Sequence, residues 1–183
     1  MTLTGPSGSG KSTLLRCLLG FVPFTGAISV DGISIDVRSI WDIRQKIAYV
    51  AQEPDLGDDR VEATLRLPLN YRANRSLRWD PGEVDALCEV FLLSPGLLTK
   101  EMSTLSGGEK QRIALIAALL LHRPLLLLDE AGSALDGAAK QQVREYLVSR
   151  TDLTILSVSH DVREFVFPGA VHNLPDLAKD SAP

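Results

Sequence analysis

An α/β fold built around a mostly parallel sheet is predicted by three features of the sequence. Two apolar runs, at residues 124–130 and 153–160, end in polar side chains, as central strands buried on both faces do. Helical patterns separate the predicted strands, and this alternation implies crossover connections between parallel strands. A glycine-rich segment at residues 5–13 joins a strand end at residues 1–4 to a helix. Because ligands bind at the carboxyl ends of such strands, the polar strand ends point to a binding site.

The composition is typical of a soluble globular protein, because 45% of the 183 residues are hydrophobic and 23% are charged. The net charge is −4, whereas nucleic-acid-binding proteins usually carry an excess of basic residues, so we expect no nucleic acid among the partners. Cys17 and Cys88 lack metal-ligand spacing and are expected to be buried thiols in a reducing compartment. No signal peptide opens the sequence, and the longest apolar run, Ile113 to Leu121, is shorter than the roughly 20 residues that cross a bilayer. We therefore expect a chain that does not itself cross a membrane.

The first third of the chain is expected to hold a helix, a hairpin and a strand. Leucines recur at helical spacing over residues 12–19, which predicts a helix there. Residues 27–35 alternate apolar and polar side chains around Asp31 and Gly32, a pair typical of a tight hairpin turn. A short strand is predicted at residues 47–50.

Residues 53–100 differ in character, because prolines separate several short helical patterns. In the clearest pattern five apolar residues lie largely on one helix face: Val84, Leu87, Val90, Phe91 and Leu92. A long helix follows at residues 107–121, and another is predicted at residues 137–150. We predict one domain, residues 1–183, in which a helical lobe of residues 53–122 is inserted into an α/β core of residues 1–52 and 123–183.

The segment GPSGSGKS, Gly5 to Ser12, fits the phosphate-binding pattern G-x-x-x-x-G-K-[ST] at every fixed position. The glycines let the backbone wrap a phosphate with its N–H groups pointing inward, and the next helix adds its positive end. The pattern predicts that Lys11 reaches the β- and γ-phosphates, that Ser12 binds Mg²⁺, and that Thr13 supports the α-phosphate. The alternative is a flexible Gly-Ser loop, but the Lys-Ser pair and the amphipathic helix stand where phosphate binding needs them.

Two acids end the apolar run at residues 124–130. Asp129 closes the predicted strand, where a carboxylate can hold Mg²⁺ through a water molecule. Glu130 follows directly and is a candidate general base for an attacking water. A solvated pair of acids in a turn is the alternative, and the phosphate-binding segment makes it the weaker interpretation.

The segment LSGGEKQR, residues 105–112, predicts a second phosphate site. Ser106 can cap the helix of residues 107–121, and Gly107 and Gly108 expose the first N–H groups of that helix. One chain then carries two phosphate sites for one nucleotide. We interpret this as a head-to-tail pair of chains, with ATP held between the first site of one and the second site of the other. The alternative is an ordinary helix cap.

Together these motifs resemble those of the nucleotide-binding subunits of ABC proteins over almost the whole chain. The phosphate-binding loop, LSGGE, LLLLDE, SALD at residues 133–136, and His160 occur in the order of that family. The resemblance implies a P-loop NTPase fold that binds ATP with Mg²⁺ and hydrolyses ATP. It also implies an ATP-dependent homodimer and an integral-membrane permease partner, with the chain on the cytoplasmic face of the cell membrane.

The resemblance further implies roles for single residues. Gln52 is expected to contact Mg²⁺ and the attacking water and to sense the transmembrane partner. His160 is expected to contact the γ-phosphate and to hold Glu130 and the water in line. Ser106 and Gly108 are expected to reach the γ-phosphate of the partner's ATP, and Asp136 to link the two sites.

The expected site therefore has three groups of residues. The catalytic group is Lys11, Gln52, Glu130 and His160, and the metal group is Ser12, Gln52 and Asp129. The nucleotide-binding group comprises the phosphate loop, the second phosphate site and an acid beyond them: Gly5, Pro6, Ser7, Gly8, Ser9, Gly10, Lys11, Ser12, Thr13, Leu105, Ser106, Gly107, Gly108, Glu109 and Asp136.

The sequence departs from the family pattern in three places. The antiparallel strands that usually precede the loop are largely missing, and no aromatic residue for stacking on adenine stands before Gly5. We expect a mis-set or truncated start, because the strand end at residues 1–4 buries little and the hairpin is left with a bare edge. The tail after His160 is brief and broken by two prolines, so a further strand is not expected there. Ile116 and Ala117 stand where many relatives have an alanine-arginine pair.

The amino-acid sequence of the lobe most resembles the ATPase subunits of two-component bacterial exporters linked to iron homeostasis. We therefore expect the chain to be the motor subunit of a transporter, and this resemblance suggests a metal such as iron as the cargo. The alternatives are an ABC module that binds ATP with little turnover and a soluble ABC ATPase without a transport role. Four lobe residues form either a docking patch for a membrane helix or part of the lobe's own core: Leu65, Leu67, Leu69 and Tyr71.

Overall fold

The computed structural model describes residues 1–160 and 165–175 of the chain. Its main sheet has five strands in the order β4-β5-β6-β1-β7, and each neighbouring pair is parallel. This confirms the predicted α/β architecture. The strands are β1 (Thr2–Thr4), β4 (Ile47–Val50), β5 (Leu125–Asp129), β6 (Thr154–Ser159) and β7 (Val171–Asn173).

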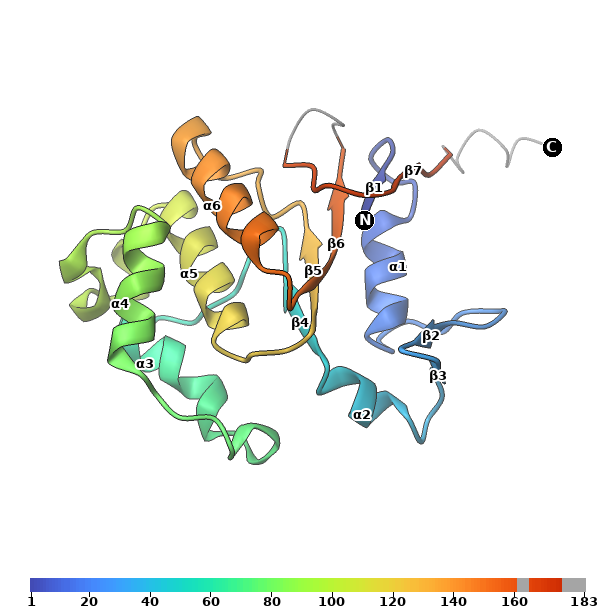
Figure 1. Ribbon diagram of the computed structural model, residues 1–183, viewed down its shortest axis with the longest axis horizontal. Coiled ribbons are helices and arrows are strands. Elements are labelled where there is room, and N and C mark those ends of the chain that lie inside the picture. The colour runs from blue at the N-terminus through green and yellow to red at the C-terminus, as the bar shows by residue number, and fades with distance from the viewer. Residues whose placement is uncertain (161–164, 176–183) are drawn as a thin grey trace.

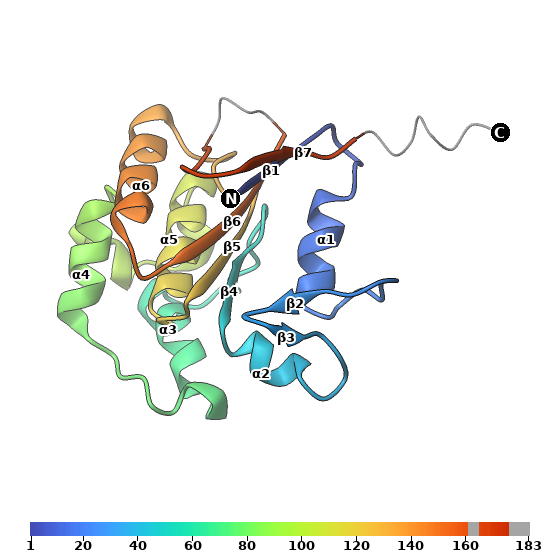
Figure 2. The same cartoon turned by 45° about the vertical axis from the view of Figure 1, so that its right-hand side comes forward.

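Helices cover both faces of this sheet. Helix α1 (Lys11–Leu18) lies on one face, and α5 (Gly107–Leu119) and α6 (Gly137–Ser149) lie on the other (Figures 1 and 2). The central strand β5 serves both layers, because successive side chains of a strand point to opposite faces. Leu125 and Leu127 pack with Leu15 of α1, whereas Leu126 and Leu128 join the cluster under α5 and α6. A run of four leucines is thus explained by burial on both sides.

The predicted hairpin is present as a small separate sheet. Strands β2 (Ser29–Val30) and β3 (Ile33–Ser34) are antiparallel, with Val30 opposite Ile33. The two turn residues, Asp31 and Gly32, have φ values of 56° and 75°. Both values lie in the left-handed region that a two-residue hairpin turn needs, and an Asp-Gly pair tolerates them. Helix α2 (Ile40–Arg44) then leads the chain into β4.

The helical segments between β4 and β5 share a hydrophobic core with one face of the sheet. They are α3 (Val61–Arg66), η1 (Leu67–Asn70), η2 (Arg72–Asn74), α4 (Pro81–Val90), η3 (Pro95–Thr99), η4 (Met102–Thr104) and α5. Phe91, Leu97 and Met102 are fully buried and belong to the same cluster as Ala48 and Val50 of β4. No helix in the described ranges is long and apolar enough to span a bilayer.

The sequence left open whether Leu65 belongs to a docking patch or to the core of the lobe, and it placed Leu92 on an apolar helix face. Leu65 is buried in the core cluster, which agrees with the second alternative, whereas Leu67 and Tyr71 are 51% and 56% exposed. Leu92 lies beyond the end of α4 with φ of 55° and is exposed, so it leaves the apolar helix face predicted for it.

The tail also differs from the sequence expectation, because it contributes strand β7. Thr2 to Thr4 pair in parallel with Val171 to Asn173, and the N–H of Leu174 donates to the carbonyl of Thr4 at 2.7 Å. The two prolines flank these residues and interrupt none of them. A strand this short carries little pattern in the sequence, and its partner β1 offers unpaired backbone groups that favour pairing.

The start of α5 is packed against the chain that follows β5. Ser106 and Glu109 form a capping box, in which the Glu109 N–H donates to Ser106 Oγ and Glu109 Oε2 accepts from the Ser106 N–H. A methyl group placed on Gly108 would lie 2.8 Å from the carbonyl oxygen of Ala134. One placed on Gly107 would meet no described atom within 4 Å.

This difference gives a prediction with a built-in control. Gly108→Ala is expected to lower the free energy of unfolding by about 1–3 kcal/mol, because a Cβ must displace backbone at Ala134. Gly107→Ala, one residue earlier in the same turn, is expected to be neutral or to stabilise by up to about 1 kcal/mol through lower chain entropy. Urea unfolding followed by circular dichroism measures both. Equal effects of the two substitutions would contradict the packing described here.

Candidate functional site

The phosphate-loop residues lie between the carboxyl end of β1 and the start of α1. Gly8 and Gly10 have φ values of 84° and 88°, a conformation that side chains rarely adopt. The Ser9 N–H donates to the carbonyl of Pro6 at 3.2 Å, which closes the turn. Ser9 Oγ is buried and has no hydrogen-bond partner among the described residues. The loop therefore has the backbone form that an anion could use, whereas Ser9 is 2% exposed and does not line the cavity described below.

Lys11 lies along this loop. Its ammonium group donates to the carbonyls of Gly5 and Pro6 at 2.9 and 2.8 Å, and the residue is 4% exposed. Among the described residues, neutral carbonyls are the partners of this buried positive charge, which is therefore available to an incoming anion. Because Lys11 is also the first residue of α1, its charge adds to the positive end of that helix.

Asp129 receives two hydroxyl donors at the carboxyl end of β5. Ser12 Oγ donates to its Oδ1 at 2.8 Å, and the Tyr49 hydroxyl donates to its Oδ2 at 3.1 Å. Burial and the charge of Asp129 together raise the pKa of Tyr49 to about 12, so this hydroxyl keeps its proton at neutral pH. A serine hydroxyl beside a carboxylate is the oxygen chemistry that Mg²⁺ prefers, so these residues fit that ion.

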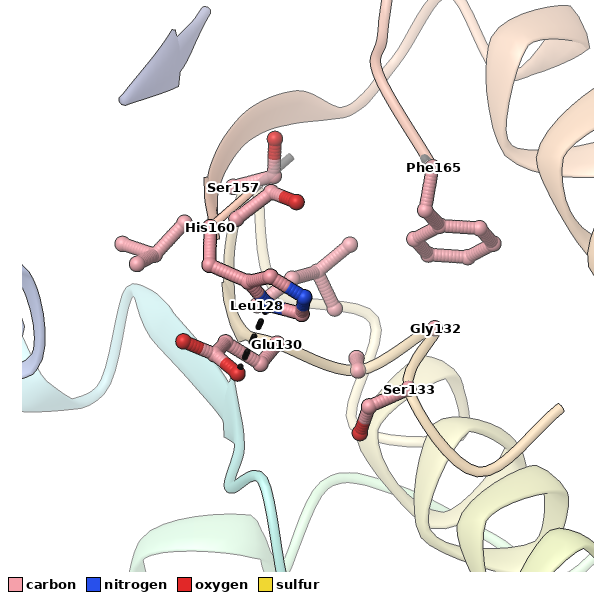
Figure 3. Close-up of a pocket in the computed structure, with 10 residues that line it drawn as sticks. Leu128, Glu130, Gly132, Ser133, Ser157, His160 and Phe165 are labelled. Carbon is pink, nitrogen blue, oxygen red and sulfur yellow. Dashed lines mark hydrogen bonds and ion pairs between the residues drawn. The ribbon is translucent and has the colours of Figure 1, made fainter. Parts of the chain in front are cut away.

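Two polar side chains contact the carboxylate of Glu130. Gln52 Nε2 donates to Glu130 Oε2 at 3.1 Å. His160 Nδ1 lies 3.3 Å from the same oxygen, and Figure 3 shows this contact as a dashed line. Glu130 has φ of 48°, which is strained for a residue with a side chain and is typical of functional sites. The structure thus brings together three of the four predicted catalytic residues.

A cavity of about 280 Å³ joins the loop to this cluster, and its lining residues come from three parts of the chain: Ser7, Gly8, Gly10, Lys11, Ser12, Thr13, Gln52 and Glu130. Within the described residues, the predicted second phosphate site does not reach this cavity: neither Leu105 nor Ser106 to Glu109 lines it. Both helix starts nevertheless lie at the same end of the molecule (Figure 1).

Asp136 likewise lies apart from the cavity. Its side chain caps α6 by accepting from the Ala139 N–H at 2.9 Å, and this bond lowers the pKa of Asp136. Asp136 also forms a long ion pair with Arg112 of α5 at 3.9 Å. Similarly, the hydrogen bonds from Ser106 lower the pKa of Glu109. The structure therefore places the predicted second phosphate site and Asp136 next to each other but away from the loop.

Two residues that touch this region were not singled out from the sequence. Tyr49 contacts Asp129, and its position as the last residue but one of β4 is the signal that could have indicated it. Gln111 is 1% exposed and donates to the carbonyl of Ala51 at 3.2 Å, so α5 is tied to the segment that carries Gln52. A glutamine on the buried face of an apolar helix needs such a partner, and this requirement was available from the sequence.

Comparison with known proteins identifies the family. The model of the ABC transporter family matches residues 1–133. The chain is 35% identical to the energy-coupling factor transporter ATP-binding protein EcfA1 of Latilactobacillus sakei, over 90% of this chain and 60% of that protein. It is 39% identical to the "Probable iron export ATP-binding protein FetA" of Escherichia coli, over 88% of this chain and 72% of that protein. The chain thus spans about 60% of the length of EcfA1.

Solved structures give the same fold. The dimeric structure of the bacterial ABC transporter cassette MJ0796 superposes with a TM-score of 0.81 at 26% identity, over 95% of this chain and 80% of that one. A second structure of MJ0796, described as a dimeric post-hydrolysis state bound to ADP and Pi, gives a TM-score of 0.80 at 26% identity, over 94% and 79%. The family model, the relatives and the motif order agree, and the chain belongs to the ABC transporter family.

Proposed function

We propose that this chain is the ATP-hydrolysing motor subunit of an ABC transporter. The observation that carries the proposal is the convergence of Gln52 and His160 on one carboxylate oxygen of Glu130, at the edge of the cavity that holds Lys11 and Ser12. A carboxylate held in this way beside a phosphate-binding loop is suited to act as a general base on water.

Hydrolysis would then be an in-line attack of water on the γ-phosphate. Glu130 takes the proton from the water, the water oxygen bonds to the γ-phosphorus, and ADP leaves. Gln52 and His160 hold the carboxylate in place, while Lys11 and the N–H groups of the loop stabilise negative charge on the phosphates. Ser12, Asp129 and Gln52 would hold Mg²⁺, which supplies further neutralisation of phosphate charge when it is bound.

The second phosphate site would act on the nucleotide of a partner copy. Ser106 and Gly108 lie at the start of α5 and do not line the cavity of their own chain. A head-to-tail dimer would place these residues, with Leu105, Gly107 and Glu109, against the ATP held by the other copy, and Asp136 between the two sites. The relative MJ0796 forms a dimer, which supports this arrangement.

A membrane-spanning permease is the proposed partner on the cytoplasmic face of the cell membrane. The exposed Leu67 and Tyr71 stand directly before three exposed arginines, Arg72, Arg75 and Arg78. Apolar side chains beside positive charge suit a partner segment that is apolar and acidic. In this proposal residues 1–183 form one ATPase domain, in which the lobe of residues 53–122 moves the partner. Similarity to FetA favours metal export, with iron as the first cargo to test.

Glu130→Gln tests the catalytic assignment. The amide keeps the size of the side chain but cannot accept a proton, so phosphate release should fall by about 10²–10⁴-fold. ATP should still bind, and the dimer should accumulate with Mg-ATP and separate with ADP. Phosphate-release assays and light scattering measure the two effects.

The matched control is Glu145→Gln, the same chemical change at an exposed position of α6. It should leave turnover and dimerisation unchanged. A wild-type chain that binds ATP without releasing phosphate would instead favour a nucleotide-binding module with little turnover. ATP hydrolysis that is unaffected by Glu130→Gln would remove Glu130 from the proposed chemistry.

Mixing two inactive variants tests the head-to-tail arrangement. Lys11→Ala disables the loop and Ser106→Arg blocks the second phosphate site, so each variant alone should be inactive. A mixed dimer contains one intact composite site, so an equal mixture should recover about a quarter of wild-type hydrolysis if pairing is random and the sites work independently. Recovery should depend on total protein concentration. A mixture as inactive as its components would argue against sites shared between two chains.

A further inference from the structure

We propose that Tyr49 is a positioning residue of the metal–nucleotide site, whose hydroxyl holds the carboxylate of Asp129 beside Ser12. The inference rests on the proposed function and concerns a residue to which none of the motifs assigns a role. It is drawn from the position of Tyr49 in the sheet, from the hydrogen bonds of Asp129 and from the packing of the tyrosine ring.

The register of the sheet brings Tyr49 to Asp129. Tyr49 lies opposite Leu127 in the parallel pair β4–β5, and Asp129 is two residues further along β5 on the same face. This diagonal relation is within reach of a long aromatic side chain. The hydroxyl donates to Asp129 Oδ2 at 3.1 Å. The contact therefore follows from strand pairing, which is more rigid than a loop.

The hydrogen bonds of Asp129 explain why the Tyr49 hydroxyl matters for the orientation of this carboxylate. Asp129 is 4% exposed, and a carboxylate so far from water needs donors on its oxygens. Ser12 supplies one on Oδ1 and Tyr49 supplies one on Oδ2. If Ser12 turns to Mg²⁺ when nucleotide binds, its hydroxyl no longer serves Asp129. The Tyr49 hydroxyl is then the donor that keeps the carboxylate in its orientation.

The ring of Tyr49 has a separate structural role. It packs against the cluster on the α1 face that contains Leu15, Ile43 and Leu127. Phenylalanine would fill the same space, so Tyr49→Phe removes the hydroxyl and keeps the packing. A role limited to packing predicts that this substitution changes nothing at the metal site.

The experiment measures binding of a fluorescent ATP analogue by the whole chain, first in EDTA and then with increasing MgCl₂. Tyr49→Phe should leave affinity in EDTA within about twofold of wild type, because the phosphate loop is untouched. The Mg²⁺ concentration for half-maximal enhancement should rise by about tenfold, the loss typical of a removed outer-shell partner of a metal ligand. Binding is read without turnover, so the result does not depend on catalysis.

Two further variants separate positioning from other effects. In an Asp129→Asn background, Tyr49→Phe should produce no additional shift, because the group it positions has been changed. Tyr146→Phe, the same substitution at a tyrosine of α6 whose hydroxyl accepts from Arg150 and which does not line the cavity, should show the Mg²⁺ dependence of wild type. Urea unfolding confirms that each variant is folded.

Each remaining result has one meaning. An unchanged Mg²⁺ dependence in Tyr49→Phe overturns the inference and leaves the proposed function standing. A shift of equal size in the Asp129→Asn background also overturns it, because Tyr49 would then act by another route. A wild-type chain whose nucleotide binding ignores Mg²⁺ would refute the proposed metal-dependent function itself, and the inference with it.

Discussion

Burial of β5 on both faces is the constraint on which the rest of the structure depends. Leu126 and Leu128 hold the sheet to α5 and α6, while Leu125 and Leu127 hold it to the face covered by α1. A strand fixed from both sides ends at a defined place, and Asp129 and Glu130 stand at that place. The close-packed core therefore positions the two carboxylates.

The same strand end separates two kinds of chemistry. Asp129 points to the α1 face, where the hydroxyls of Ser12 and Tyr49 surround it. Glu130 follows with a positive φ, and this turn carries its carboxylate to Gln52 and His160. The strained backbone costs about 1–3 kcal/mol, which the buried strand before it can offset. Two adjacent acids thereby reach different partners, one suited to a metal and one suited to water.

Much of this arrangement could be predicted from the sequence, because its signals are local. The Asp31-Gly32 turn, the glycines of the phosphate loop and the Ser106 cap each express a backbone requirement within a few residues. Strand β7 could not be predicted in this way, and the sequence could not decide between burial and exposure of Leu65, since both depend on partners far along the chain. The contact of Tyr49 with Asp129 is only partly predictable from the sequence. It follows from strand register once β4 and β5 are known to be neighbours.

The position of α5 links these features to the proposed pairing with a second chain. Gln111 is buried and donates to the carbonyl of Ala51, so the helix that begins at the proposed second phosphate site is tied to the segment carrying Gln52. A shift at the start of α5, where a partner's nucleotide would bind, would therefore reach Gln52 through one hydrogen bond and the packing around it. Because Gln52 also holds Glu130, the proposed base would respond to occupation of the partner's site. This chain of contacts gives a physical route by which two sites in a dimer could act together.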